Sequence, residues 1–311
     1  MRAAVDLAFA PSRGPLRIGA EVEMHLLSGS VEGAPPAGQA VSFEPGGQLE
    51  LSIAPQPSVP ALTAEIARGL AWASSRAEVA LTGTHPHRDE TEVPLATPTP
   101  RYLAMQRVLD RTGPDGRRMM RLTASLQVCV DRLPGPRGEE QWLVANLAGP
   151  ALAAAYAHSP HAGGRPSLVP GNRTRIWQGL PQDRVGYDGR HLDARDPVGA
   201  YTAFAEAAPR LPLPAADDDG YHLGTLFPPV RPRPGYLELR FLDAQPLDRV
   251  GPLLATLWRL MYDDEVRRPA LDLLLPGLGD LWSQWEQAAL GRSAYLADLL
   301  DVVDGRGRVP A

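Results

Sequence analysis

Five glutamates occupy positions from which their carboxylates could share one face of a β-sheet. In the segment 17–27, Glu21 and Glu23 alternate with Ala20 and Val22, so both carboxylates point to the same side of a strand. Neighbouring carboxylates repel each other, and a protein tolerates them most easily where a cation lies between them. For this segment alone, an exposed strand with its glutamates in water is the alternative. The other glutamates of this kind are Glu44, Glu50 and Glu238.

Such a set offers oxygen ligands without sulfur or a convincing group of imidazoles. His85 and His87 stand in a loop segment, where exposed histidines are more often solvated than metal-bound. Oxygen ligands alone select a hard cation such as Mg²⁺ or Mn²⁺. The sequence therefore predicts a site for a cation of this class.

Polar and basic side chains accompany the carboxylates. Arg240 shares a strand face with the nearby glutamate, and Arg121 and Gln127 share the polar face of the alternating run 121–131. This run has mostly short, uncharged polar residues on that face, which favours a ligand-lining strand over an exposed one.

Two further arginines, Arg173 and Arg175, follow a loop rich in Gly and Pro. Guanidinium groups bind phosphate or carboxylate oxygens through paired hydrogen bonds, so these arginines are candidates for binding an anion. Surface pairing with Asp183 and Asp188 explains them equally well.

Carboxylate-bound magnesium surrounded by arginines is the usual apparatus for nucleotide phosphates. The sequence has no Gly-x-x-x-x-Gly-Lys-Ser/Thr motif and no Gly-x-Gly-x-x-Gly after a strand. ATP would therefore be bound by neither a P-loop nor a dinucleotide-binding fold.

The elements that must position these residues can be read from periodicity. Polar and apolar residues alternate in four segments, 17–27, 41–52, 121–131 and 236–246. Helical spacing of apolar residues predicts helices over 62–73, 100–112, 139–159 and 196–207, and two or three more over 247–300. If the strands share a sheet, helices cover its apolar face and the acidic residues converge on the other. The predicted fold class is α+β, with a mainly antiparallel sheet that has one polar, metal-lined face and helices packed on the other.

The composition is that of an ordinary globular protein in one domain, 1–311. The formal net charge of −5 argues against nucleic acid as a partner, and no segment has the length and hydropathy of a membrane span. A single cysteine, Cys129, and an N-terminal segment 1–14 without signal-peptide features favour a cytoplasmic protein. The glycine-rich tail 305–311 is predicted to form no element, and the sequence carries no signal for an oligomeric state.

Six blocks in order resemble glutamate–cysteine ligases of the plant type, including the actinobacterial enzymes of ergothioneine biosynthesis. The resemblance extends from about residue 17 to the tail. The sheet of this family is similar to that of glutamine synthetase. The blocks are Gly19-Ala20-Glu21-Val22-Glu23, Glu44 to Ser52, Arg101 to Met105, Met119 to Val128, Thr225 to Arg231, and Tyr236-Leu237-Glu238-Leu239-Arg240.

The resemblance implies a glutamine synthetase-like catalytic domain that joins L-glutamate to L-cysteine with ATP. The γ-carboxylate would be phosphorylated, and the amine of cysteine would displace phosphate to give γ-glutamylcysteine, the first step of ergothioneine biosynthesis. The partners are thus small-molecule substrates. Carried over by position, the Mg²⁺ ligands would be Glu21, Glu23, Glu44, Glu50 and Glu238.

The resemblance also suggests roles for the other polar residues. Arg240 would steady the transferring phosphoryl group, and Gln127 stands where related ligases often have a histidine that faces metal or substrate. Arg173, Arg175 and Arg231 would bind the glutamate carboxylate or the phosphates, with Arg121 a weaker member of this set.

Departures from the family pattern bear on the acceptor amine. Cys129 stands where Asn is common, Gly224 replaces a usual Thr, and the loop 209–220 looks shortened. Two alternatives therefore stay open: a γ-glutamyl ligase that uses another amine, and a catalytically weak relative that binds nucleotide or a partner and has a regulatory role.

Overall fold

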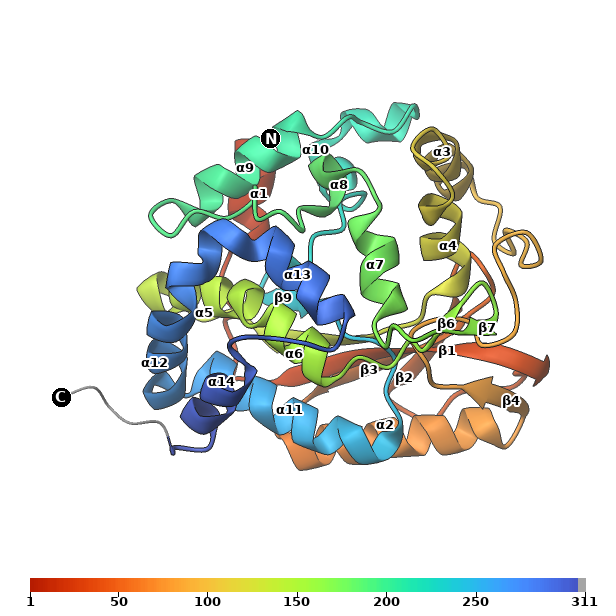
Figure 1. The fold of residues 1–311 in the computed structure, drawn as a ribbon, viewed down its shortest axis with the longest axis horizontal. Coiled ribbons are helices and arrows are strands. Elements are labelled where there is room, and N and C mark those ends of the chain that lie inside the picture. Colours follow the sequence, from red (N-terminus) through yellow and green to blue (C-terminus); the bar gives the residue numbers. More distant parts are fainter. Residues whose placement is uncertain (307–311) are drawn as a thin grey trace.

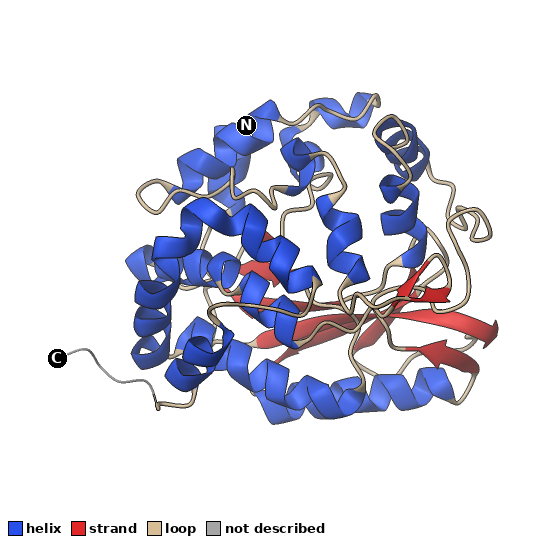
Figure 2. Cartoon of the chain, in the orientation of Figure 1, coloured by secondary structure: helices blue, strands red, loops and turns tan. Residues whose placement is uncertain are grey.

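A computed structural model describes residues 1–306, and its centre is a seven-stranded sheet with antiparallel pairing throughout (Figures 1 and 2). The strand order is β2-β3-β1-β5-β9-β8, and β4 pairs with the second half of β1. A separate two-stranded hairpin consists of β6 and β7. The strands are β1 (Ile18–Gly29), β2 (Gln39–Phe43), β3 (Leu49–Gln56), β4 (Ala77–Ala80), β5 (Leu126–Asp131), β6 (His161–Ala162), β7 (Arg165–Pro166), β8 (Val230–Arg233) and β9 (Tyr236–Leu239).

Helices surround this sheet on several sides (Figure 2). They are α1 (Arg2–Ala8), α2 (Val59–Ser74), α3 (Pro100–Leu109), α4 (Asp115–Leu122), α5 (Gly135–Leu147), α6 (Gly149–Ala155), α7 (Asn172–Gln178), α8 (Gln182–Val185), α9 (Pro197–Ala207), α10 (Asp219–Leu223), α11 (Leu247–Tyr262), α12 (Asp264–Leu274), α13 (Leu281–Ala289) and α14 (Leu296–Val303), with 3₁₀ helices η1 (Pro214–Asp217) and η2 (Leu275–Asp280). The α+β class and the mainly antiparallel sheet agree with the prediction.

The central strand β1 forms where alternation predicted a strand. Its apolar side chains Ala20, Val22 and Met24 are at most 2% exposed and belong to the main core. The opposite face is also covered, because Glu23 is 8% exposed and His25 is 2% exposed. Glu23 is therefore buried and Glu21 is half-buried, which argues against the interpretation of this segment as an exposed strand.

The acidic segment 41–52 is a hairpin rather than one strand. Strands β2 and β3 are joined by a tight turn in which the amide of Gly47 donates to the carbonyl of Glu44 over 2.8 Å. Gly47 has φ of +85°, a backbone conformation that glycine adopts without steric penalty. The turn places Glu44 at the end of β2, beside the acidic residues of β1 and β3.

Helices lie on both sides of the sheet, not on the apolar side alone. On one side, α2 packs on β1, β3 and β4, and α11 packs on α2 (Figure 1). Gly69 permits this approach, because a Cβ there would lie 3.0 Å from a methyl group of Leu51. On the other side, α3, α4 and α7 stand over the polar face (Figure 1). The polar face is thus the floor of a roofed space.

Several predicted boundaries are wrong. The run 121–131 divides into the end of α4 and strand β5, so Arg121 lies in a helix rather than on a strand. Arg173 and Arg175 lie in helix α7 rather than in a loop. The segment 247–300 contains four α-helices instead of two or three. The segment 1–14, for which no element was predicted, contains α1.

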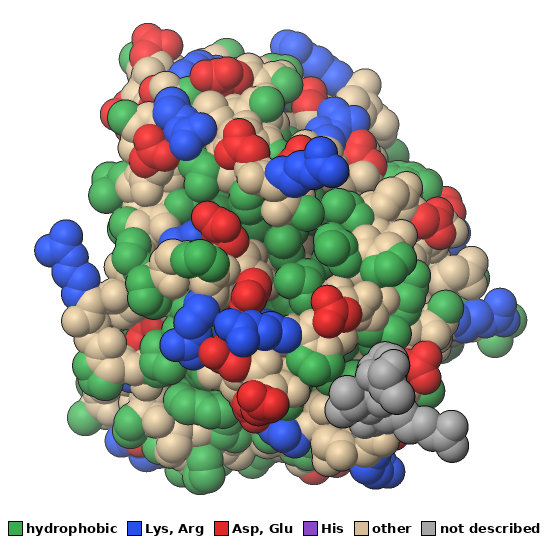
Figure 3. Space-filling view, turned by 90° about the vertical axis from the view of Figure 1, so that its left-hand side faces the viewer, with side chains coloured by type: hydrophobic (Ala, Val, Ile, Leu, Met, Phe, Trp, Pro, Cys, Tyr) green, Lys and Arg blue, Asp and Glu red, His purple; other side chains and the backbone are tan. Residues whose placement is uncertain are grey.

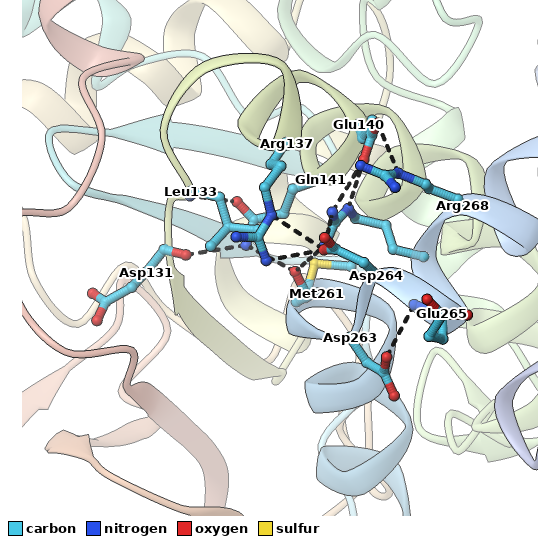
Figure 4. Close-up of polar contacts among 11 residues, drawn as sticks. Asp131, Leu133, Arg137, Glu140, Gln141, Met261, Asp263, Asp264, Glu265 and Arg268 are labelled. Atoms are coloured by element: carbon cyan, nitrogen blue, oxygen red, sulfur yellow. Dashed lines mark hydrogen bonds and ion pairs between the residues drawn. The ribbon is translucent and has the colours of Figure 1, made fainter.

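An ionic network joins α5 to α12 (Figure 4). The Arg267 guanidinium is fully buried and donates to Glu140 over 3.0 Å and to Asp264. Arg137 also donates to Asp264, and Arg268 lies near Glu140 at the surface. The surface on this side mixes acidic, basic and apolar side chains (Figure 3).

Across residues 1–306, no helix has both the length and the apolar character needed to cross a membrane. The prediction for the tail falls mostly on residues 307–311, which lie outside the described part of the chain.

An acidic cavity on the sheet as candidate active site

Strand register brings the predicted polar residues into adjacent rows. Glu23 of β1 lies opposite Glu50 of β3. Glu21 lies between Ser52 on one side and Gln127 of β5 on the other. Because residues that lie directly opposite each other share a sheet face, these side chains form one polar surface. Antiparallel pairing, together with burial of the alternate apolar residues, fixes this arrangement.

Three of the glutamates form a compact cluster, the acidic trio of Glu23, Glu44 and Glu50. One carboxylate oxygen from each lies within 4.8 Å of the others. The hydroxyl of Ser42 donates to Glu50 over 2.7 Å, and the backbone amide of Ser125 donates to Glu23 over 2.8 Å. These neighbours orient the carboxylates but supply no full positive charge.

The electrostatics of the acidic trio favour a bound cation. Burial, with the charges of Glu23 and Glu50, raises the pKa of Glu44 to about 8. Burial, with Glu238 and Glu50, raises the pKa of Glu21 to about 7. Burial also raises the pKa of Glu23. Oxygen ligands that converge in a buried place fit a hard divalent cation, which would remove the repulsion that opposes their ionisation.

The other end of the polar surface is basic. Glu238 accepts hydrogen bonds from Arg231 over 2.6 Å and from Arg233 over 3.1 Å, and also from Arg240. Burial alone would raise the pKa of Glu238, but these three guanidinium groups hold it well below its ordinary value. Three positive charges on one carboxylate leave an excess positive charge at this end, which suits an anionic ligand.

Gln127 connects the two ends. Its amide nitrogen donates to Glu23 over 2.7 Å, and its amide oxygen accepts from Arg240. A side chain with both a donor and an acceptor can make these two bonds at once, which neither Glu nor Lys could do.

Helices α3, α4 and α7 supply the walls of a cavity of about 160 Å³ above this surface. Arg101 and Tyr102 come from α3, Met119 from α4, and Arg173 and Trp177 from α7. The Arg173 side chain is 3% exposed, and its guanidinium donates to the carbonyls of residues 241 and 240 over 3.1 and 2.8 Å. It therefore points inward, toward the residues that follow β9.

Most of the predicted site residues meet at this cavity. Its lining includes Glu21, Glu23, Glu44, Glu50, Gln127, Arg173, Arg231 and Arg240. Glu238 contacts two of these arginines from the same sheet face. It lies outside the acidic trio, as does Glu21.

Besides Glu238, two predicted residues, Arg121 and Arg175, do not line the cavity. The Arg121 guanidinium donates to the carbonyls of Glu90 and Val93 over 3.1 Å and to the side chain of Gln106. It therefore ties a loop to α4. Arg175 is exposed and lines other hollows of the surface.

Sequence reasoning missed Arg101, Tyr102 and Trp177 as lining residues. Arg101 and Tyr102 lie in a block that carried the resemblance, which was the available signal. Arg101 donates to the carbonyl of Gly224 over 2.6 Å, so the unusual glycine contributes its backbone at the edge of the site.

Cys129 lies in an adjoining hollow that shares Glu21 with the cavity, and burial raises the pKa of its thiol.

Comparisons with known proteins identify the family of the chain. The family model described as Glutamate-cysteine ligase family 2 (GCS2) matches residues 8–308. Glutamate–cysteine ligase EgtA of Mycolicibacterium smegmatis is 32% identical over 89% of this chain and 75% of that protein. EgtA of Mycobacterium tuberculosis is 31% identical over 88% of this chain and 71% of that protein.

A chloroplastic glutamate–cysteine ligase of Arabidopsis thaliana is 30% identical over 76% of this chain. The match covers 51% of that protein, so the chain spans about half the length of this plant relative. The family match over nearly the whole sequence, together with the mycobacterial relatives, shows that the chain belongs to glutamate–cysteine ligase family 2.

Proposed function

We propose that the chain joins the γ-carboxylate of L-glutamate to the amine of L-cysteine, with ATP as the source of the activating phosphoryl group. The products are γ-glutamylcysteine, ADP and phosphate, and the intermediate is γ-glutamyl phosphate. The observation that carries this proposal is one cavity with a cluster of carboxylates at one end and arginines at the other. Supply of ergothioneine biosynthesis is part of the proposal, as the sequence resemblance implies.

The acidic trio would hold Mg²⁺. The ligands would be carboxylate oxygens from β1, from β3 and from the turn after β2, and the sheet fixes the positions of these residues. When bound, the metal supplies charge neutralisation on the phosphates. Glu21 and Glu238 remain proposed ligands of a further cation, and Glu238 would then exchange an arginine partner for metal.

The arginines divide into two groups by position. Arg231 and Arg240 share Glu238 at the basic end, where they would stabilise negative charge on the transferring phosphoryl group. Arg173 and Arg101 reach the cavity from the helical wall, where they would bind the carboxylates of an amino acid substrate. Gln127 would hold Arg240 in place relative to the acidic trio.

The chemistry needs no histidine base, because phosphorylation converts the γ-carboxylate into a group with a good leaving group. Positioning of the amine beside the acyl carbon and neutralisation of charge then supply most of the rate enhancement. The histidine that related ligases often have at position 127 is replaced here by Gln127, whose role in this cavity is to form hydrogen bonds.

The test is a ligation assay with purified protein, Mg²⁺, ATP and glutamate, in which ADP release is followed with cysteine or with other amines. Cysteine-dependent turnover supports the proposal. Turnover with a different amine, and none with cysteine, would show that this amine is the acceptor substrate. ATP binding without turnover for any amine would favour the regulatory alternative. Glu23→Gln should reduce the activity at least about tenfold. Glu78→Gln, at an exposed position of β4, should leave the activity unchanged.

A further inference from the structure

A second cavity lies on the far side of the helices that wall the candidate active site. Its volume is about 440 Å³, and it is bounded by α4, α7, the loop after β4 and the β6–β7 hairpin. In Figure 1 these elements lie together at one end of the sheet. The polar lining residues are Thr84, His85, Asp115, Arg118, His161, Asn172 and Arg175.

Helix geometry separates this cavity from the acidic one. Arg173 and Arg175 are two residues apart in α7, and two steps of 100° place their side chains on opposite sides of a helix. Arg173 lines the acidic cavity, whereas Arg175 lines the second cavity. Residues of α4 also line both cavities: Met119 lines the acidic cavity and Arg118 lines the second cavity.

The charged groups of the second cavity leave a guanidinium available. Arg118 is paired with Asp115 over 3.1 Å and with Glu90 over 2.9 Å. Asp115 is the carboxylate of the lining, and it shares Arg118 with Glu90. Within residues 1–306, the Arg175 side chain forms no hydrogen bond or ion pair. It also borders a groove with Glu286, on the side of α13.

The imidazoles add directed hydrogen-bonding groups. Nδ1 of His85 accepts from the backbone amides of His87 and Arg88, each over 3.2 Å. An imidazole nitrogen that accepts carries no proton, so neutral His85 is protonated on Nε2 and Nε2 is a donor. Nδ1 of His161 is buried and has no partner among the described residues.

We propose that this second cavity is a binding site for a small anion with phosphate or carboxylate oxygens, with Arg175 as its principal cation. A metal ion there would lie beside two guanidinium groups, and an apolar ligand would leave the imidazole and guanidinium donors without partners. The site is separate from the ligation chemistry, and its existence does not depend on the proposed function.

Imidazole NMR of the whole chain tests the site, with inorganic phosphate as the probe at constant ionic strength. The chain has seven histidines, and His191 and His222, which are buried elsewhere, serve as internal references. Phosphate should shift the resonances of His85 and His161 in a saturable manner. Arg175→Gln should raise the apparent Kd about tenfold or more, because it removes a charge-assisted hydrogen bond.

Two control variants make the result specific. Arg240→Gln alters the acidic cavity, where phosphate also has reason to bind, and should leave the shifts of His85 and His161 unchanged. Arg107→Gln removes an exposed positive charge from α3 and should also have no effect. A thermal melt of Arg175→Gln that matches the wild type shows that the fold is intact.

A parallel titration with citrate distinguishes the source of the anion. Binding of phosphate alone assigns a phosphoryl ligand, and binding of citrate alone assigns a carboxylate ligand; either result supports the site. The proposal is overturned if neither anion shifts His85 and His161, or if Arg175→Gln binds as tightly as the wild type.

Discussion

Replacement of Arg240 by glutamine is expected to slow ligation far more than it destabilises the fold. Arg240 links Glu238 at the basic end of the site to Gln127, since it donates to both side chains. Its removal would leave Glu238 with Arg231 and Arg233, so the buried carboxylate keeps two positive partners. Folding therefore survives the change, while the charge that faces the cavity is lost.

The magnitudes follow from the positions of these groups. Loss of one preorganised group that stabilises transition-state charge typically reduces kcat by about 10²–10³. Loss of one hydrogen bond to a buried charge lowers the free energy of unfolding by about 1.5–3 kcal/mol. Arg233 offers a matched control, because it donates to the same carboxylate but lines an apolar hollow behind β8 instead of the cavity. Arg233→Gln should change kcat by less than about fivefold, the equivalent of 1 kcal/mol.

Steady-state ADP release at saturating substrates, with urea denaturation of the same preparations, measures both effects. The interpretation predicts a large loss of kcat for Arg240→Gln with a folded protein, and a small loss for Arg233→Gln. Equal losses of kcat for the two variants would show that the hydrogen bonds to Glu238, and not the position of Arg240 in the cavity, are what the reaction needs. An Arg240→Gln enzyme with nearly full activity would refute the proposal that Arg240 stabilises the transferring phosphoryl group.

Three further predictions concern the scaffold. Gly46→Ala should reduce activity at least about tenfold through displacement of the acidic turn, because a Cβ there would overlap the backbone of Arg121; the ligation assay measures this effect. Burial lowers the pKa of His191 to about 3 in the folded protein. In the unfolded chain the pKa of histidine is about 6.5, so the unfolded state binds the proton first as the pH falls. Below about pH 6.5 the free energy of unfolding therefore decreases by up to ~1.4 kcal/mol per pH unit. His191→Gln should therefore show a shallower loss of stability in urea denaturation between about pH 7.5 and 5. Arg267→Met, which breaks the network in Figure 4, should lower the free energy of unfolding by about 1–3 kcal/mol, because it leaves partly buried carboxylates without their partner. The exposed Arg268→Met should lower it by less than about 0.5 kcal/mol in the same measurement.

Periodicity predicted which residues share the polar face of the sheet, for a physical reason. In a strand, alternation assigns each side chain to a face, and burial of Val22 and Leu51 on one face leaves Glu23 and Glu50 on the other. The sequence could not show that helices also roof the polar face, because that depends on how distant segments pack.

The errors arose where a short pattern fits two structures. Arg121 lies in an apparent alternating run, yet the preceding Met119 and Met120 are buried against the core and extend α4 through it. For Arg173 and Arg175, a spacing of two places side chains together on a strand but apart on a helix. Trp177 was missed because the inward face of a short helix is decided by its packing, not by its composition.

The five glutamates, equivalent as a pattern in the sequence, are not equivalent in the structure. At Glu44 burial and like charges raise the pKa, whereas at Glu238 three guanidinium groups lower it. At one end of the cavity the carboxylates therefore repel each other, whereas guanidinium groups are in excess at the other end. A nucleotide–metal complex carries both kinds of charge, so this polarity would orient it along the sheet, with Gln127 at the junction. The order of charges along the floor, more than the number of carboxylates, is what suits this cavity to phosphoryl transfer.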